Sequence, residues 1–428
     1  METYSATEPL TATGRIGPRL SNEHKPIRVR VGKGKEGKIR LSPTAADIEF
    51  EQTVAAFIAE HLDPAVQHRV ANSMSIDKAT QADWTRKLAA AGWAAPNWPV
   101  EYGGTGWSMR RRHQFEVLMR GHNAPETQGF GFNMVGPAII QYGSAEQKAH
   151  YLPLILNAEI SWCQGYSEPG AGSDLASLTT RAEIVGDEYR VNGAKIWTSG
   201  AERADHIFVL VRTDVTAKKQ LGISFLLIPM TSAGIRVEAL YAFNGKRLWN
   251  QVFFDDVMVP RSNRLGAENQ GWTVAKTLLG DERLMVSRVA ENKRILARVR
   301  GLLKDTGLKD AALAAKAAQI EIRLTALEAT ALRLLSRFDG GGKIGAEPSM
   351  LKLQGSQLVQ VQDQLLFEIA GLYGLPLDAE SRQTPNAPIH RETVDMIGSA
   401  LFHHRGYTIA GGASEVQRNI IAQQVLGL

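Results

Sequence analysis

The residues best suited to chemistry stand in two short stretches, Gly165-Tyr-Ser-Glu-Pro-Gly-Ala-Gly-Ser-Asp174 and Lys195-Ile-Trp-Thr-Ser199. In the first, Pro169 fixes a backbone angle while Gly170 and Gly172 carry no side chain, so backbone amides can approach a ligand closely. In the second, Trp197 offers a stacking face and Ser199 a hydroxyl group. A glycine loop alone is equally compatible with a plain turn between strands. The two stretches together favour a site for a flat, redox-active ring.

Glu282 is a candidate proton acceptor because it falls inside an apolar helical pattern. We expect a helix over residues 274–289, with an apolar stripe formed by Val274, Leu278, Leu279, Met285, Val286 and Val289. Burial there raises the pKa of a glutamate above its usual value of about 4.3 and makes it a better base. A structural ion pair with Arg283, with Arg288 or with a distant arginine accounts for the same pattern. The pattern alone leaves both interpretations open.

The composition is that of a globular protein. Of its 428 residues, 44% are hydrophobic and 22% are charged, which suits two or three domains. No apolar run approaches the roughly 20 residues that cross a bilayer, and the first residues resemble neither a signal nor a transit peptide. The single cysteine, Cys163, excludes an internal disulfide and argues against a cysteine-based metal site. We therefore expect a soluble, cytoplasmic protein without a metal or a membrane partner.

The formal net charge of +5 belongs to one end of the chain. Residues 1–40 hold nine Lys and Arg residues against four Glu residues, so the rest of the chain is neutral on balance. This segment is rich in glycine and lacks helical periodicity, which predicts a peripheral arm over 1–41. A solvated extension is the simpler interpretation; contact with a partner subunit or with acidic phosphates is the alternative. The charge does not indicate a nucleic-acid-binding protein.

The periodicity of apolar residues predicts helical, β and helical regions in that order. A helix begins near Ser42 and Pro43, and others are expected around 84–91, 110–121 and 145–156. After Ile160 the period changes to two, with a hairpin on an Asn192-Gly193 turn and buried strands at 206–212 and 223–228. Long helical patterns return from Trp272. The predicted domains are a basic arm 1–41, a helical domain 42–160, a β domain 161–266 and a helical bundle 267–428.

The chain resembles the acyl-CoA dehydrogenase family over roughly residues 42–428. Besides the two stretches above, five segments look like family landmarks in family order: Ala89-Ala-Ala-Gly-Trp93, Trp98-Pro-Val-Glu-Tyr-Gly-Gly104, Tyr142-Gly-Ser-Ala-Glu-Gln-Lys148, Phe253-Phe-Asp-Asp-Val257 and Gly411-Gly-Ala-Ser-Glu-Val-Gln-Arg418. The resemblance implies an α+β architecture with an N-terminal helical domain, a β-barrel-like middle domain and a C-terminal four-helix bundle.

The resemblance also implies FAD as cofactor and an acyl-CoA as substrate. The reaction is removal of an α-proton with hydride transfer from the β-carbon to flavin N5, giving the 2-enoyl-CoA, with an electron-transfer flavoprotein as acceptor. By resemblance, Ser173 and Arg283 contact the substrate. The flavin contacts carried over by resemblance fall on Gln164, Ser167, Gly172, Ser173, Trp197 and Ser199.

Many family members carry their catalytic glutamate just before the last helix, where this chain has Gly411. A second group, which resembles isovaleryl- and long-chain acyl-CoA dehydrogenases, keeps Glu-Arg on an earlier helix, as in Glu282-Arg283. A glycine at 411 leaves room for the carboxylate from the other helix, and its N–H can polarise the thioester oxygen. Gly411 and Gly412 could equally form a turn before a helix that Ser414 and Gln417 cap as a capping box. Both interpretations can hold together.

Two family segments that grip the FAD phosphates of a neighbouring subunit are missing. Residues 305–320 contain no Arg or Phe, and the second segment has become Glu368-Ile-Ala-Gly-Leu-Tyr-Gly374. Backbone amides hardly replace a lost bidentate arginine contact. The chain resembles the larger subunit of bacterial heteromeric acyl-CoA dehydrogenases of the pimeloyl-CoA or steroid side-chain type, which implies a related small subunit in an α2β2 assembly. A flavin oxidase or monooxygenase on the same fold and a non-catalytic partner subunit are the alternatives.

Overall fold

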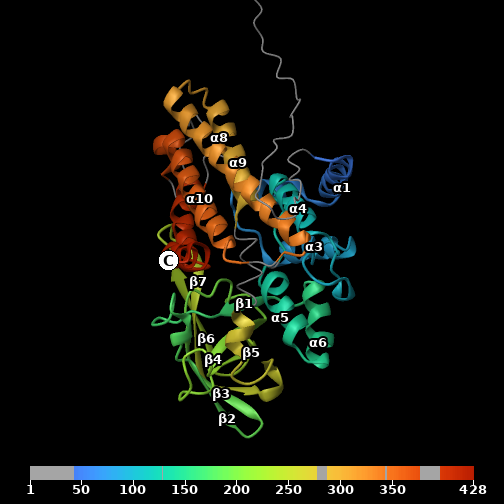
Figure 1. Cartoon of the computed structure of the whole chain (residues 1–428), viewed down its shortest axis with the longest axis vertical. Coiled ribbons are helices and arrows are strands. Elements are labelled where there is room, and N and C mark those ends of the chain that lie inside the picture. The colour runs from blue at the N-terminus through green and yellow to red at the C-terminus, as the bar shows by residue number, and fades with distance from the viewer. Residues whose placement is uncertain (1–42, 128, 277–286, 343–344, 376–395) are drawn as a thin grey trace, which may run out of the picture.

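The computed structural model describes residues 43–127, 129–276, 287–342, 345–375 and 396–428. Figure 1 shows an elongated molecule with the sheet at one end, the long helices α8, α9 and α10 at the other, and the N-terminal helices along one side. The expected α+β class with helical, β and helical regions is confirmed. No helix in the described part of the chain is long and apolar enough to cross a membrane.

Six α-helices form the first region. They are α1 Ala45–His61, α2 Pro64–Ala71, α3 Lys78–Ala90, α4 Met109–Gly121, α5 Gly136–Tyr142 and α6 Ala145–Leu156. α1 begins two residues later than predicted, because Thr44 and Asp47 form the capping box that fixes its start. A π-helical segment, Gly131–Val135, leads directly into α5. Such segments are frequent at functional sites.

Eight strands form one sheet in the order β6-β7-β3-β2-β4-β5-β8, with β1 parallel to β4. The strands are β1 Trp162–Gly165, β2 Arg181–Val185, β3 Glu188–Lys195, β4 His206–Arg212, β5 Ile223–Pro229, β6 Ile235–Tyr241, β7 Arg247–Pro260 and β8 Arg264–Leu265. Inward side chains of β3 and β7 share one core cluster with those of β4 and β5, so the sheet folds over on itself. The described strands end at β6 on one edge of the sheet and at β8 on the other. These two strands do not pair with each other, so the barrel-like sheet is open between them.

The predicted hairpin turn at Asn192-Gly193 is wrong. Both residues lie within the single strand β3, and the register of its pairing with β7 shifts between Val191 and Gly193. The dipeptide therefore makes a β-bulge rather than a turn. The actual reversal lies between β2 and β3, where Val185 pairs with Glu188. A bulge and a tight turn share the same residue preferences, so the local sequence does not separate them.

The C-terminal region packs around α10. Its helices are α8 Val289–Asp305, α9 Ala311–Asp339, α10 Pro348–Ala370, α12 Ile397–His403 and α13 Ser414–Ile420. α10 contacts each of the other four, and α4 of the first region packs on α8 and α9. A separate core cluster also covers the opposite face of β4 and β5 with side chains from the N-terminal helices. The three regions therefore hold one another in place around the segments that carry the predicted site.

Candidate active site

The glycine-rich loop leaves β1 and makes a tight turn. The amide of Glu168 donates to the carbonyl of Ala171 at 2.9 Å, and the amide of Ala171 donates back to the Glu168 carbonyl at 3.0 Å. Pro169 and Gly170 form the exposed corner. A Cβ atom added at Gly170 or at Gly172 would meet no other atom within 4 Å. One side of the loop is therefore open to a ligand, as the sequence predicts.

A buried ion pair anchors the loop. The ammonium group of Lys195, fully buried on β3, donates to the Glu168 carboxylate at 2.7 Å and to the Tyr166 carbonyl at 3.2 Å. The backbone amides of Thr179 and Thr180 donate to the same carboxylate at 2.6 and 2.9 Å. Burial alone raises the pKa of Glu168, but the lysine charge and these hydrogen bonds outweigh it and lower the pKa to about 2. Glu168 is therefore a structural anion and does not serve as a base.

The aromatic step lies beside the loop in space. The amide of Ile196 donates to the Ser167 carbonyl at 2.9 Å. The next residue, Trp197, has a φ of +61° and keeps 57% of its surface exposed, although it is a large aromatic residue. Left-handed backbone is costly for such a residue and persists only where its surroundings impose it. The Trp197 ring makes an edge-to-face contact with Trp249 at 5.6 Å between centroids, and more than half of the residue remains accessible.

Several hydroxyl groups of the glycine-rich loop and of the segment around Trp197 have no hydrogen-bond partner among the described residues. The hydroxyl groups of Ser167, Ser173 and Ser199 make no hydrogen bond to any described residue, and the buried Thr198 hydroxyl is unpartnered as well. Gln164 donates only a long contact, 3.8 Å, to the Met134 sulfur. Buried polar groups normally find partners. The arrangement therefore fits a bound planar group with several heteroatoms.

Aromatic contacts connect Trp197 to the C-terminal region that contains the turn at Gly411. The Trp249 ring stacks on His403 at 6.1 Å between centroids. Gly411 has a φ of +67°, and a Cβ added there would meet nothing within 4 Å, so the space in front of it is open. The Gly411 amide makes no backbone hydrogen bond in the described part of the chain. The buried Lys352 on α10 fixes the turn by donating to the Gly412 carbonyl at 2.6 Å.

The predicted capping box at α13 is wrong. The N-cap of this helix is Ala413, and no side chain caps it. Ser414 is already the first helical residue, and its buried hydroxyl has no partner among the described residues. The amide of the Gln417 side chain turns back to the Gly412 carbonyl at 3.3 Å. Gln417 thus contacts the glycine turn rather than the helix end.

The candidate base Glu282 and its neighbour Arg283 lie outside the described residues, as do Leu278, Leu279, Met285 and Val286. The flanks are described. Residues 271–276 are helical, with Val274 and Ala275 in the core shared with the sheet. The predicted helix does not continue unbroken to Val289: Arg288 is left-handed, with a φ of +51°, and α8 starts one residue later.

Tertiary contact explains this break. Gly355 of α10 approaches so closely that a Cβ there would lie 2.0 Å from the Ser287 carbonyl oxygen. The Asn292 side chain donates to the Arg288 carbonyl at 2.8 Å and to the Gly355 carbonyl at 3.2 Å. The Arg288 guanidinium lies over the ring of Tyr407, 3.7 Å from its centroid. No local sequence pattern encodes these contacts.

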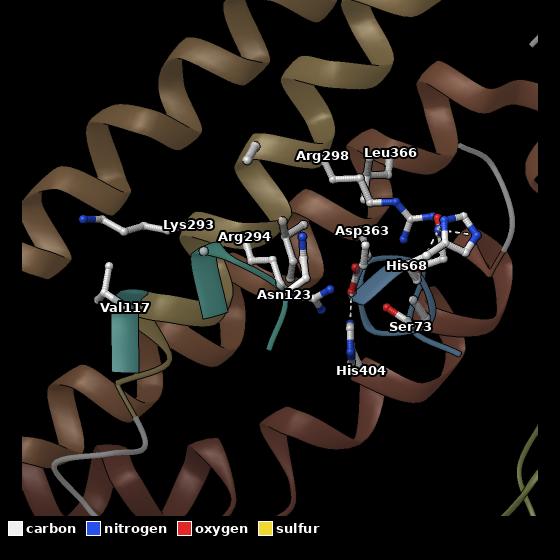
Figure 2. A pocket seen from close by; sticks show the side chains of 16 residues that line it. His68, Ser73, Val117, Asn123, Lys293, Arg294, Arg298, Asp363, Leu366 and His404 are labelled. Atoms are coloured by element: carbon white, nitrogen blue, oxygen red, sulfur yellow. Dashed lines mark hydrogen bonds and ion pairs between the residues drawn. The ribbon is translucent and has the colours of Figure 1, made fainter. Parts of the chain in front are cut away.

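Two cavities lie near these elements. The larger, about 530 Å³, opens where α2 and α4 end against α8, α10 and α12. Figure 2 shows charged side chains along it, among them Lys293, Arg294 and Arg298 from α8, and the hydrogen bond of 2.7 Å between Asp363 and His404. Such a wall does not suit a hydrocarbon group.

The smaller cavity, about 360 Å³, lies between α3, α4 and α5, the C-terminal part of α9 and the start of α10. Its walls are mostly apolar, and it includes Ser287, which follows the segment of Glu282, and Asn133 of the π-helical segment. Met134, beside Asn133, contacts Gln164 of β1, the strand that leads into the glycine-rich loop. This cavity is therefore the one placed to receive an apolar group beside the ring platform.

Sequence comparison matches three family models along the chain. They describe the N-terminal, middle and C-terminal domains of acyl-CoA dehydrogenases and match residues 44–159, 163–257 and 269–426. The chain belongs to the acyl-CoA dehydrogenase family. This family is FAD-dependent. The exposed Trp197 and the hydroxyl groups without hydrogen-bond partners among the described residues fit a flavin.

Among related acyl-CoA dehydrogenases, IpdE1 of Mycolicibacterium smegmatis is 34% identical over 360 residues, 81% of this chain and 87% of that protein. FadE26 of Mycobacterium tuberculosis is 34% identical over 359 residues, 80% of this chain and 86% of its own length. The Tcur3481-Tcur3483 steroid acyl-CoA dehydrogenase has a TM-score of 0.80 at 29% identity, covering 91% of this chain and 99% of that one. The ChsE4-ChsE5 complex from Mycobacterium tuberculosis has a TM-score of 0.76 at 31% identity, over 91% and 99% of the two chains.

In this acyl-CoA dehydrogenase the structure brings together most of the predicted site. One strand and the loop that follows it carry Gln164, Ser167, Gly172 and Ser173. Two hydrogen bonds, from Ile196 to Ser167 and from Lys195 to Glu168, join this loop to the segment that carries Trp197 and Ser199. Sequence reasoning missed the Glu168 and Lys195 pair, although a glutamate in the glycine loop and a lysine just before the tryptophan were visible signals. It also missed the polar residues of the smaller cavity. Their signal is Glu116 and Arg120, spaced four apart beside the buried Phe115 and Met119 of α4.

Proposed function

We propose that this chain is a catalytic subunit that desaturates a bulky acyl-CoA to its 2-enoyl-CoA with bound FAD. The observation that carries the proposal is the strained, exposed Trp197 beside an anchored loop, in which the Ser167 and Ser173 hydroxyl groups have no hydrogen-bond partner among the described residues. Gln164, Ser167, Gly172, Ser173, Trp197 and Ser199 are the residues we assign to the flavin ring. The domain boundaries 42–160, 161–266 and 267–428 are proposed with it.

We assign the general base to Glu282. Val274 and Ala275, eight and seven residues before it in the chain, are buried in an apolar core. Their burial supports a desolvated and therefore more basic carboxylate at Glu282. Glu168, a carboxylate of the loop, is already used by Lys195 and two backbone amides. The free space at Gly411 supports entry of a carboxylate from another helix.

The remaining steps follow from the chain's own groups. The flavin, when bound, supplies the acceptor for the β-hydrogen as a hydride. Glu282 removes the α-proton. The Gly411 amide, which makes no backbone hydrogen bond among the described residues, donates one to the thioester oxygen and stabilises the negative charge that develops there. Lys352 keeps that amide oriented through the Gly412 carbonyl. Ser173 and Arg283 are assigned to the acyl-CoA.

We further propose that a related small subunit completes the FAD site, in an α2β2 assembly, and that an electron-transfer flavoprotein accepts the electrons. The missing phosphate-binding segments in 305–320 and 368–374 support this. Two similar solved structures, by their titles, pair two named chains, ChsE4 with ChsE5 and Tcur3481 with Tcur3483.

Anaerobic titration tests the reaction. We expect a decalin-propanoyl-CoA, added to the flavin-loaded complex without oxygen, to bleach the oxidised flavin absorbance and yield the enoyl-CoA. Flavin reoxidation should then require an electron-transfer flavoprotein and proceed slowly with oxygen. Rapid oxygen consumption would indicate an oxidase or monooxygenase instead. An unbleached spectrum with every acyl-CoA tried would favour a non-catalytic subunit.

A further inference from the structure

Apolar residues form most of the wall of the smaller cavity, and three of its polar side chains carry a group without a hydrogen-bond partner among the described residues. One end of the Asn97 amide and the Nε2 atom of His113 are both buried without a hydrogen bond to any described residue. The carboxyl group of Glu116 likewise makes no hydrogen bond in the described part of the chain, and all three residues line the same cavity. His113 and Glu116 are three residues apart on α4 and so share one face of that helix. Leaving a buried polar group unpaired costs about 1–3 kcal/mol each. Two such groups beside a partly buried carboxyl group in one cavity point to a ligand.

Arg120, one turn further along α4, does not neutralise Glu116 directly. Its guanidinium forms an ion pair with Glu126 and donates to Glu291 at 3.1 Å. Glu291 is shared in turn with Arg294, at 2.9 Å. The Glu116 carboxyl group therefore has no hydrogen-bond or ion-pair partner among the described residues. Burial raises its pKa to about 7, with Arg120 opposing the rise, so the group can act as a donor or as an acceptor near neutral pH.

The cavity is placed for the acyl group rather than for the CoA moiety. It borders Ser287, which follows the segment of the assigned base, and the π-helical segment whose Met134 contacts Gln164. From there it extends between α3, α4 and α9. Its volume of about 360 Å³ suits a ring system. A plain hydrocarbon group would bury the three polar side chains without satisfying them.

We propose that Glu116, assisted by His113 and Asn97, recognises an oxygen substituent on the acyl group. The substrate class is then a bulky acyl-CoA that carries a hydroxyl or carbonyl oxygen distant from the thioester. Glu116 is a specificity-determining residue in this scheme and takes no part in proton transfer at the α-carbon. The inference rests on the proposed function, because it takes the cavity to be the acyl site.

Two synthetic probes test this. They share a decalin-propanoyl-CoA skeleton and differ only in a ring hydroxyl group at the end far from the thioester. Calorimetric titration of the flavin-loaded complex gives both dissociation constants without any need for turnover. We expect the hydroxylated probe to bind about 10- to 100-fold more tightly than its parent. Glu116→Leu should remove most of that difference, while Glu116→Gln, which keeps the shape and can still hydrogen-bond, should retain it within a few-fold.

Equal affinities of the unmodified complex for the two probes would overturn the inference, as would a difference that survives Glu116→Leu. Failure of both probes to bind would overturn it too, since the cavity would then not be the acyl site. If the probes bind with the expected difference but are not desaturated, the proposed function fails while the recognition by Glu116 stands. The Glu116→Leu complex should still bind the parent probe, which shows that the variant is folded.

Discussion

Replacing Glu282 with glutamine is expected to lower the rate of acyl-CoA desaturation by roughly 10²- to 10⁴-fold, the usual contribution of a positioned general base. Glutamine keeps the size and most of the polarity of the side chain but cannot accept the α-proton. The substitution should leave FAD content and acyl-CoA affinity near those of the unmodified complex. Stopped-flow measurement of flavin reduction isolates this step from product release.

The matched control is Glu321→Gln, because Glu321 is an exposed carboxylate on α9 whose ion-pair partner among the described residues is Arg300. This control should reduce its flavin at the unmodified rate. A Glu282→Gln complex that also did so would remove Glu282 from the mechanism. The base would then have to be sought among other carboxylates near Gly411.

Replacing Lys195 with methionine is expected to destabilise the protein by about 3–5 kcal/mol, because it leaves the Glu168 carboxylate buried without its counter-charge. The loop that carries Ser167 and Ser173 should loosen with it, and FAD should be lost. Urea unfolding followed by tryptophan fluorescence measures the first effect. Adding Glu168→Gln to the same chain removes the uncompensated charge and should recover part of the stability.

The pH dependence of this pair has a definite sign. Glu168 has its pKa lowered from 4.5 to about 2 in the folded protein, so its stabilising contribution is present above pH 4.5 and is lost as the pH falls toward 2. The difference in stability between the unmodified protein and Lys195→Met should therefore shrink in this acid range. A difference that stayed constant down to pH 2 would contradict the ion pair as its cause.

The parts of the site that are local in sequence were predictable. The sequence predicts an open loop from Pro169, Gly170 and Gly172, and a stacking face from Trp197. In the structure there is open space at both glycines, and the loop is hydrogen-bonded to the segment that carries Trp197. A continuous apolar run, typical of a buried strand, likewise predicted β4 with its observed bounds. Family resemblance added the roles, which local patterns alone left open.

The parts that depend on distant contacts were not predictable. Arg288 interrupts the expected helix because α10 approaches at Gly355, 67 residues along the chain. The bulge at Asn192-Gly193 depends on pairing with β7, whereas its residues are equally typical of a turn. The smaller cavity arises where α4 meets helices of both helical regions. Spacing along one helix cannot show which face meets another.

The FAD content of the purified chain, with and without a co-expressed small subunit, tests the central claim most directly. The account predicts that the chain expressed alone retains little FAD, because it carries the ring platform but lacks the phosphate-binding segments in 305–320 and 368–374. Co-expression with a related small subunit should give a complex with stoichiometric FAD that desaturates a bulky acyl-CoA. Stoichiometric FAD and full desaturation by the chain alone would contradict the account.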